Sequence, residues 1–152
     1  GFEQRSFEMR STKYENSKQE RKSTKFETGK EMRNVSGEKK YDLEDRTLAF
    51  AKSVRKFVRE LKMDIPNRED GKQLVRSSGS VGANYREANN GLSKKDFIYR
   101  IKICRKEAKE TCYWLNLIDA HENQGLETTR KELLQEANEL MLIFGSILRK
   151  SQ

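Results

Sequence analysis

Two segments of the sequence place lysine and arginine at spacings that could bind phosphate groups. Between residues 52 and 62 there are five basic residues against Glu60 alone, and between residues 93 and 109 there are seven against Asp96 and Glu107. At about 100° per helical residue, most of these side chains lie opposite the apolar side of a helix. The residues that we assign to a phosphate-binding surface are Lys52, Arg55, Lys56 and Arg59 in the first segment and Lys95, Lys102, Arg105, Lys106 and Lys109 in the second.

A row of basic residues along one side of a helix has two interpretations. Any solvated helix has a charged face, and this is the more common origin of such a pattern. The shortage of nearby acidic residues instead favours an electrostatic surface for nucleic acid, and we follow this interpretation. Because we expect no exposed aromatic residues between these lysines, we predict contacts to the phosphate backbone with little sequence readout. Structured RNA is the favoured ligand, with DNA as the alternative.

Residues that could support catalysis are few. The sole histidine, His121, lies in the polar segment DAHEN near the expected end of a helix, and Cys104 and Cys112 lie eight residues apart in that helix, too far for a disulfide. The sequence has no Cys-x-x-Cys pair, phosphate-binding glycine loop or nucleophile elbow. We therefore expect a non-enzymatic protein with reduced thiols and with no metal, cofactor or small-molecule substrate.

The composition suits one small helical domain. Of 152 residues 34% are hydrophobic, 37% are charged and one is proline, and the net charge is +8. No apolar run could cross a membrane, and the first residues have no secretory apolar core. We expect a cytoplasmic protein without membrane contact.

Residues 1–40 differ from the rest of the chain. FEQRS at residues 2–6 is followed by FEMRS at 7–11, and STKYEN at 11–16 recurs as STKFET at 23–28. These repeats bury no regular face, so we predict that residues 1–40 are a disordered, charged extension. A basic arm that touches nucleic acid is one interpretation, and a solvated extension without its own role is the favoured one.

From residue 41 onward, apolar residues recur at spacings of three and four. They predict four amphipathic helices at about residues 42–63, 68–90, 94–123 and 129–149. Asn67, Ser93 and Thr129 are the expected N-caps of the last three helices, and Gly125 is the expected left-handed residue that ends the third. Short turns between such helices favour an all-α, antiparallel up-down-up-down four-helix bundle over residues 41–150.

Gly79 and Gly82 interrupt the second helical pattern. On a helix they share a strip beside the apolar seam with Ser78, and small residues on one strip let a neighbouring backbone approach closely. We interpret both as helix-packing residues. The alternative, a Gly-x-x-Gly loop that clamps a nucleic-acid backbone, requires a fold with a sheet, and no strand pattern is present.

Two segments resemble a known family. LVRSSGSVGANYREANNGLSKKDFIYRIKICRKEAKETCYWLNLI at residues 74–118 and YDLEDRTLAFAKSVRKFVREL at residues 41–61 are similar to the proteins encoded in intervening sequences of bacterial 23S ribosomal RNA genes. The resemblance implies a four-helix bundle that assembles into homo-pentameric rings. A more distant relative, the accessory protein of diversity-generating retroelements, binds a reverse transcriptase and RNA, which implies a partner protein, such as a nucleic-acid enzyme, as an alternative.

The sequence also contains more apolar residues than one bundle seam needs. The surplus lies on the third and fourth helices, and the residues that we assign to an oligomer interface are Tyr99, Ile103, Tyr113, Trp114, Leu117 and Met141. A wider bundle core that covers the same positions is the alternative. The leading hypothesis is thus an oligomeric bundle that binds nucleic acid, and the second is a scaffold for a partner protein.

Overall fold

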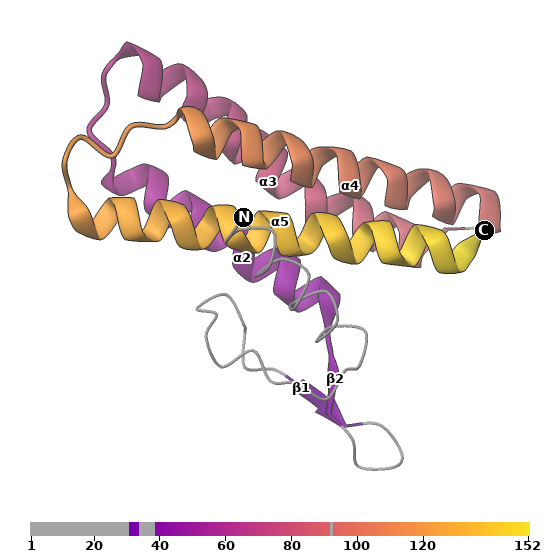
Figure 1. Cartoon of the computed structure of the whole chain (residues 1–152). Coiled ribbons are helices and arrows are strands. Elements are labelled where there is room, and N and C mark those ends of the chain that lie inside the picture. The colour runs from indigo at the N-terminus through magenta and orange to yellow at the C-terminus, as the bar shows by residue number, and fades with distance from the viewer. Residues whose placement is uncertain (1–30, 34–38, 92) are drawn as a thin grey trace.

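The computed structural model describes residues 31–33, 39–91 and 93–152. Four helices make up most of it: α2 (Leu43–Glu60), α3 (Ile65–Asn89), α4 (Lys94–Leu117) and α5 (Gln124–Ser151) (Figure 1). Two short strands, β1 (Glu31–Arg33) and β2 (Lys39–Tyr41), precede them. In this part of the chain, none of the helices combines the length and the apolar character that a bilayer crossing requires.

The helices pack side by side in an up-down-up-down order, as the sequence predicts. α3 packs against α2 and α4, and α5 packs against α4 and α2. The pairs run antiparallel: the start of α2 meets the end of α3, where Thr47 faces Gly82, and the end of α2 meets the start of α3, where Val58 faces Gly71. Because α2 and α4 each contact only α3 and α5 among the described helices, they occupy diagonal positions.

The apolar seams predicted from the sequence form the core. Phe50, Val54, Leu74, Val81 and Ile101 are among the side chains that are completely buried in it. Tyr85, Phe97 and Ile147 are partly buried against the same core. Burial of these stripes from four helices is the main driving force for the fold, at about 25 cal/mol per Å² of apolar surface.

The predicted start of the second helix is wrong by one turn. α3 begins at Ile65 and its N-cap is Asp64, whose carboxylate accepts a hydrogen bond of 2.9 Å from the backbone N–H of Asn67. Pro66 lies in the first helical turn, where the missing N–H has no cost. Asn67, the cap that we expected, is therefore inside the helix.

The predicted boundary between the third and fourth helices is also wrong. α4 ends at Leu117, and α5 begins at Gln124 with Asn123 as its N-cap, so Thr129 lies well inside α5. Gly125 is in the first turn of α5 and does not end a helix. The left-handed conformation is adopted by His121 and Glu122, with φ of 51° and 63°. Positive φ is uncommon in residues other than glycine, although histidine adopts it more often than most.

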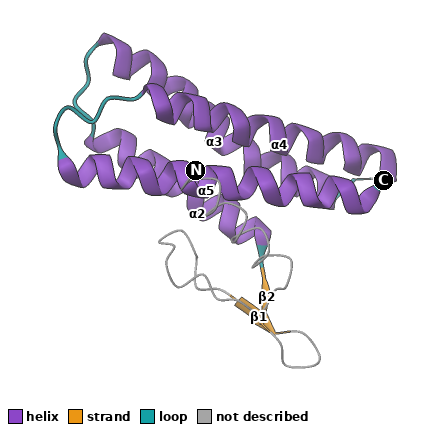
Figure 2. Ribbon diagram, viewed as in Figure 1, coloured by secondary structure: helices purple, strands orange, loops and turns teal. Residues whose placement is uncertain are grey.

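Asn67 joins two turns that are far apart in the sequence. Its side-chain amide donates to the carbonyl oxygens of Lys62 and Asp119, at 3.0 and 2.8 Å, and its amide oxygen accepts from the N–H of Asp119 at 3.1 Å. Residues 61–64 and 118–123 consequently lie at the same end of the bundle (Figure 2). The His121 imidazole pairs with Asp64 at 2.7 Å across the same two turns.

The strands fall within the segment for which we predicted disorder. β1 and β2 pair antiparallel, with Glu31 opposite Tyr41 and Arg33 opposite Lys39. The disorder predicted for residues 1–40 stays a prediction. Within that segment the structure describes only residues 31–33 and 39–40, and helical periodicity cannot reveal their strand pairing. Residues 1–30 and 34–38, including the repeats, lie outside the described residues.

A buried ionic cluster joins α2 to α5. The guanidinium of Arg46, with no exposed surface, binds Glu136 through two hydrogen bonds of 2.6 and 2.8 Å and Glu139 through one of 2.8 Å. Both carboxylates are almost completely buried. Arg46 lies one turn from Leu43 and Phe50 on the apolar side of α2. A charged residue at such a position is a sequence signal for a buried ion pair, and we did not predict one there.

Candidate nucleic-acid interface

The solvent-facing side of α4 has a continuous set of cations. Ser93 caps the helix by accepting a hydrogen bond of 3.0 Å from the N–H of Asp96, as expected. We define the α4 basic face by its exposed basic residues, which are Lys94, Lys95, Lys102, Arg105, Lys106 and Lys109. Among the residues that the structure describes, no carboxylate forms an ion pair with any of the six.

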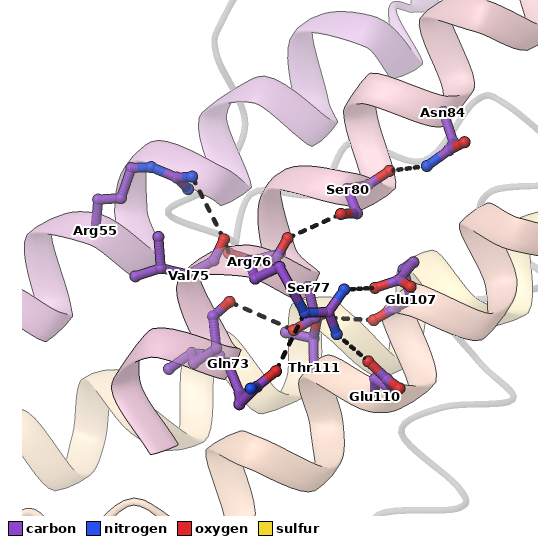
Figure 3. Close-up of polar contacts among 12 residues, drawn as sticks. Arg55, Gln73, Val75, Arg76, Ser77, Ser80, Asn84, Glu107, Glu110 and Thr111 are labelled. Atoms are coloured by element: carbon purple, nitrogen blue, oxygen red, sulfur yellow. Dashed lines mark hydrogen bonds and ion pairs between the residues drawn. The ribbon is translucent and has the colours of Figure 1, made fainter. Parts of the chain in front are cut away.

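The two acidic residues of this segment are turned away from that face. Glu107 is only 7% exposed and its carboxylate pairs with Arg76 of α3 at 3.1 Å (Figure 3). Asp96 lies in the first turn of α4, and its carboxylate reaches back toward the α3–α4 turn, 2.7 Å from the position that a Cβ atom on Gly91 would occupy. The local charge of the outward surface is therefore more positive than the sequence count alone indicates.

The charges of α4 also run against the helix dipole. Acidic residues are favourable at the positive N-terminal end of a helix and basic residues at the C-terminal end. α2 and α5 follow this rule: each has acidic residues in its first turn, and their last turns contain Arg59 and Arg149. α4 has Asp96 in its first turn, but it begins with Lys94 and Lys95 and has no basic residue in its last turn. The helix dipole therefore does not account for the positions of these two lysines.

The basic residues of α2 divide into two groups. Lys52, Lys56 and Arg59 are exposed, and we call them the α2 basic face. Arg55 turns toward α3, where its guanidinium donates a hydrogen bond of 3.4 Å to the carbonyl oxygen of Val75 (Figure 3). It donates a second, of 3.1 Å, to the carbonyl oxygen of Ala51 in α2. The assignment of Arg55 to a phosphate-binding surface is therefore not supported, because two backbone acceptors hold its charge.

Gly79 and Gly82 lie inside α3 and face α2. A Cβ atom on Gly79 would lie 2.9 Å from the guanidinium of Arg55, and one on Gly82 would lie 2.8 Å from the hydroxyl of Thr47. The absence of side chains at these positions provides the space that Arg55 and Thr47 occupy. Neither glycine breaks the helix.

The two basic faces do not form one surface. α2 and α4 are diagonal in the bundle, and α3 and α5 lie between them. One short nucleic-acid segment therefore cannot follow both faces of a single protomer. The structure brings together Lys95, Lys102, Arg105, Lys106 and Lys109 on one helix and leaves Lys52, Lys56 and Arg59 on the other side.

The six residues assigned to an oligomer interface differ in their burial. Trp114 and Met141 are partly buried against the monomer core, which agrees with the wider-core alternative for these two. Ile103 is half-buried, whereas Tyr99 and Tyr113 are each 59% exposed and Leu117 is 46% exposed.

Exposed aromatic residues do occur along the α4 basic face. Tyr99 lines a surface depression together with Lys95 and Lys102, and by helical geometry Tyr113 points in about the same direction as Lys95. The expectation that no aromatic residue interrupts the lysines is wrong, because we counted these tyrosines as a separate apolar surface.

A further basic residue, which we did not predict from the sequence, lies where α5 packs on α4. Guanidinium nitrogens of Arg149 and Arg105 lie 3.5 and 3.7 Å from the position of a Cβ atom on Gly145. Both arginines are exposed, and their approach extends the α4 basic face toward α5. Arg149 is in the last turn of α5, where the helix dipole alone would account for a basic residue.

The remaining reactive groups are held in structural contacts. Burial raises the pKa of both Cys104 and Cys112 to about 12, so the thiols are protonated at neutral pH. His121 lies in the turn after α4 and not at its C-terminal end as predicted. The N–H of Asn67 and the nearby His121 hold the pKa of Asp64 below its usual value. Among the described residues, no three His, Cys, Asp or Glu side chains gather as metal ligands would.

Comparisons with known proteins agree with the resemblance seen in the sequence. A family profile described as 23S rRNA-intervening sequence protein matches residues 39–146. A solved structure of a protein of unknown function from the S23 ribosomal protein family of Bacteroides thetaiotaomicron VPI-5482 is 34% identical, with a TM-score of 0.60, and the match covers 71% of this chain and 99% of that one. No curated protein matches the chain.

Proposed function

The chain belongs to the 23S rRNA-intervening sequence protein family, and from this premise we propose that it is a non-enzymatic, oligomeric bundle that binds nucleic acid through phosphate contacts. Structured RNA is the favoured ligand. The α4 basic face, with Arg149 beside it, is the contact surface. The exposed residues of α2 contribute only where a ligand reaches the other side of the molecule.

One observation carries this proposal: the positive charge on α4 has no function in the fold that we can identify. Its lysines pair with no described carboxylate, its Glu107 and Glu110 both pair with Arg76 of α3, and its first two residues are lysines at the end where the helix dipole disfavours cations. Each phosphate that such a face neutralises releases condensed counterions, which provides binding energy that does not depend on sequence.

We further propose that copies of the chain assemble into a homo-pentameric ring. The exposed Leu117 and the half-buried Ile103 on α4 are apolar surface that a neighbouring copy could cover. Contacts to Arg76 and Asn84 show that Glu107 and Arg100 point toward α3, and Ile103 leans in that direction, whereas Lys109 leans toward α5. One helix can therefore contact a neighbour on its α3 side and nucleic acid on its α5 side. Five copies would multiply the charge on one particle.

A scaffold that docks a partner protein is the second candidate. Met63, Ile65 and Leu117 are exposed apolar residues, with exposed fractions of 41%, 74% and 46%, and all three lie toward the end of the bundle that contains residues 61–64 and 118–123. This end is far from the start of α4. Stoichiometric recovery of one protein after nuclease treatment, abolished by Ile65→Asp, would favour this candidate.

The test of the proposed function is a titration of the full chain against labelled ribosomal RNA and length-matched duplex DNA by fluorescence anisotropy at several salt concentrations. We expect log K to fall with log salt, with a slope that reports the number of phosphates contacted. The triple variant Lys102→Glu/Lys106→Glu/Lys109→Glu should lower the affinity by about 100-fold or more. Its matched control, Lys52→Glu/Lys56→Glu/Arg59→Glu, makes the same charge change on α2.

The two variants separate the possible results. A much larger loss for the α4 variant supports the proposal, and a smaller salt slope should accompany it. Equal losses would mean that only net charge matters, and unchanged affinity in the α4 variant would exclude this face. If the wild-type chain does not bind RNA or DNA even at low salt, the α2 and α4 basic faces are ordinary solvated helix surfaces.

A further inference from the structure

The start of α4 has a surface depression of about 440 Å³. It is lined by Lys94, Lys95, Ile98, Tyr99 and Lys102, and its walls are mainly apolar. The volume is within the range of small-ligand sites, which is about 300–1,000 Å³. Its position at one end of the α4 basic face distinguishes it from the rest of that face.

The apolar character of a depression with three lysines has a physical explanation. Lysine places its charged ammonium in water and covers apolar surface with its four-carbon stem. Ile98 is half-buried and packs against the core, so it forms apolar floor, and the ring of Tyr99, 59% exposed, adds aromatic surface. The depression therefore combines an apolar, aromatic interior with a cationic rim.

This combination matches one chemical class of ligand. A nucleotide has a flat aromatic base next to an anionic phosphate, and a base can stack on tyrosine while lysines bind the phosphate. In a duplex the bases stack on one another and are not available to a side chain, so only an unpaired nucleotide can fit. We propose that this depression binds an unpaired nucleotide of the RNA, with its base stacked on Tyr99 and its phosphate near Lys94, Lys95 and Lys102.

The charge of the site favours this ligand over a second copy of the chain. Three lysines without a described carboxylate partner complement an anion, whereas a second copy of the chain has a net charge of +8. The inference rests on the proposed function and makes it more specific. It identifies loops, bulges and single-stranded ends as the bound parts of a structured RNA.

The test compares a short single-stranded oligouridine with a blunt RNA duplex that has the same number of phosphates. Both are titrated by fluorescence anisotropy against the full chain and three variants. Tyr99→Ala removes the stacking ring, Tyr99→Phe retains it, and Tyr113→Ala is the matched control. Tyr113 has the same exposed fraction as Tyr99 on the same helix but does not line the depression. Circular dichroism and native mass are measured for each variant.

We expect Tyr99→Ala to weaken binding of the single strand by about tenfold or more, since stacking of one base on an aromatic side chain is worth about that much. Tyr99→Phe and Tyr113→Ala should leave this affinity nearly unchanged. Duplex affinity should be the same in all four proteins. Preference of the wild-type chain for the single strand, lost only in Tyr99→Ala, supports the inference.

Three results would overturn it. Unchanged affinity in Tyr99→Ala, while Lys102→Glu/Lys106→Glu/Lys109→Glu weakens binding, would exclude the stacking site and leave the proposed function standing. An equal loss in Tyr113→Ala would show a general effect of surface tyrosines. A lower native mass of Tyr99→Ala would identify the depression as a contact between copies. If the wild-type chain binds neither RNA at low salt, the proposed function fails together with this inference.

Discussion

α2 and α4 have nearly the same basic pattern in the sequence but use it differently in the structure. On α2, Arg46 is buried against two glutamates, Arg55 binds backbone carbonyl oxygens and Arg59 lies in the last turn, where the dipole favours it. On α4, the cations are exposed and unpaired among the described residues, and two of them, Lys94 and Lys95, lie in the first turn, where the dipole opposes them. A run of basic residues therefore indicates ligand binding only where the fold has no use for the charge.

The largest expected effect on this comparison comes from Arg46→Ala. Removal of the guanidinium leaves Glu136 and Glu139 buried without this partner, and breaking a buried ion pair costs about 3–5 kcal/mol of stability. Chemical denaturation should show the loss, while Lys52→Ala on the same helix should change stability by less than about 0.5 kcal/mol. An unchanged midpoint for Arg46→Ala would contradict the structural role of this cluster.

Gly82→Ala should have the next largest effect. The new Cβ atom would lie 2.8 Å from Oγ1 and 3.1 Å from Cβ of Thr47, a buried and stiff side chain, so α2 and α3 must separate slightly. Overpacking costs about 1–3 kcal/mol and alanine gains about 1 kcal/mol in helix propensity, so we expect a net loss of up to about 2 kcal/mol in thermal denaturation.

Gly79→Ala is the matched control for that variant. Its new Cβ atom meets the flexible end of Arg55, which can move, and alanine gains about 1 kcal/mol in helix propensity. The net change should be near zero. Equal destabilisation by the two substitutions would contradict this distinction.

Arg55→Ala separates stability from binding on α2. Loss of the hydrogen bonds to Ala51 and Val75 should reduce stability by about 1 kcal/mol, and RNA affinity should not change. Lys56→Ala, one residue along the helix and fully in solvent, should affect stability very little. A lower RNA affinity of Arg55→Ala would mean that Arg55 does contribute to RNA binding.

Lys94→Glu is the smallest and sharpest test of α4. An acidic residue at the first helical position interacts favourably with the dipole, so stability should rise by about 0.3–1 kcal/mol. RNA affinity should fall, because the same lysine lines the depression. Opposite changes in melting temperature and affinity would show that this lysine serves binding at the expense of stability. A decrease in both would indicate a structural role for Lys94.

The sequence was sufficient to predict the four helices and their core because periodic burial is a local pattern. Leu74, Val81 and Leu140 are buried where the three- and four-residue spacing places them. Helix ends were less predictable. Asn67 is a good local signal for an N-cap, but its side chain binds Asp119, 52 residues away, and Asp64 caps α3 instead. Gly125 is a good local signal for the end of a helix, but it follows Asn123, the N-cap of α5, and lies in the first turn of that helix.

The sequence was sufficient to predict which basic residues α4 exposes, but not where every basic side chain points. Helical geometry placed the lysines of α4 on one side, as the structure has them. It could not show that Arg55 bends onto α3 while Lys56 stays in solvent, because that choice depends on the space left by Gly79. Arg149 was not predictable either, since its approach to Arg105 requires the packing of α5 on α4.

The side chain of Asn67 has a consequence for how the molecule opens. At the end of the bundle that contains residues 61–64 and 118–123, no covalent link connects the α2–α3 hairpin to the α4–α5 hairpin, but two hydrogen bonds between the Asn67 side-chain amide and the backbone of Asp119 join them. These hydrogen bonds couple the two hairpins into one cooperative unit, so neither hairpin can open alone at this end. The amide hydrogen of Asp119, although it lies in a turn, should therefore exchange with solvent about as slowly as the amides of the helices.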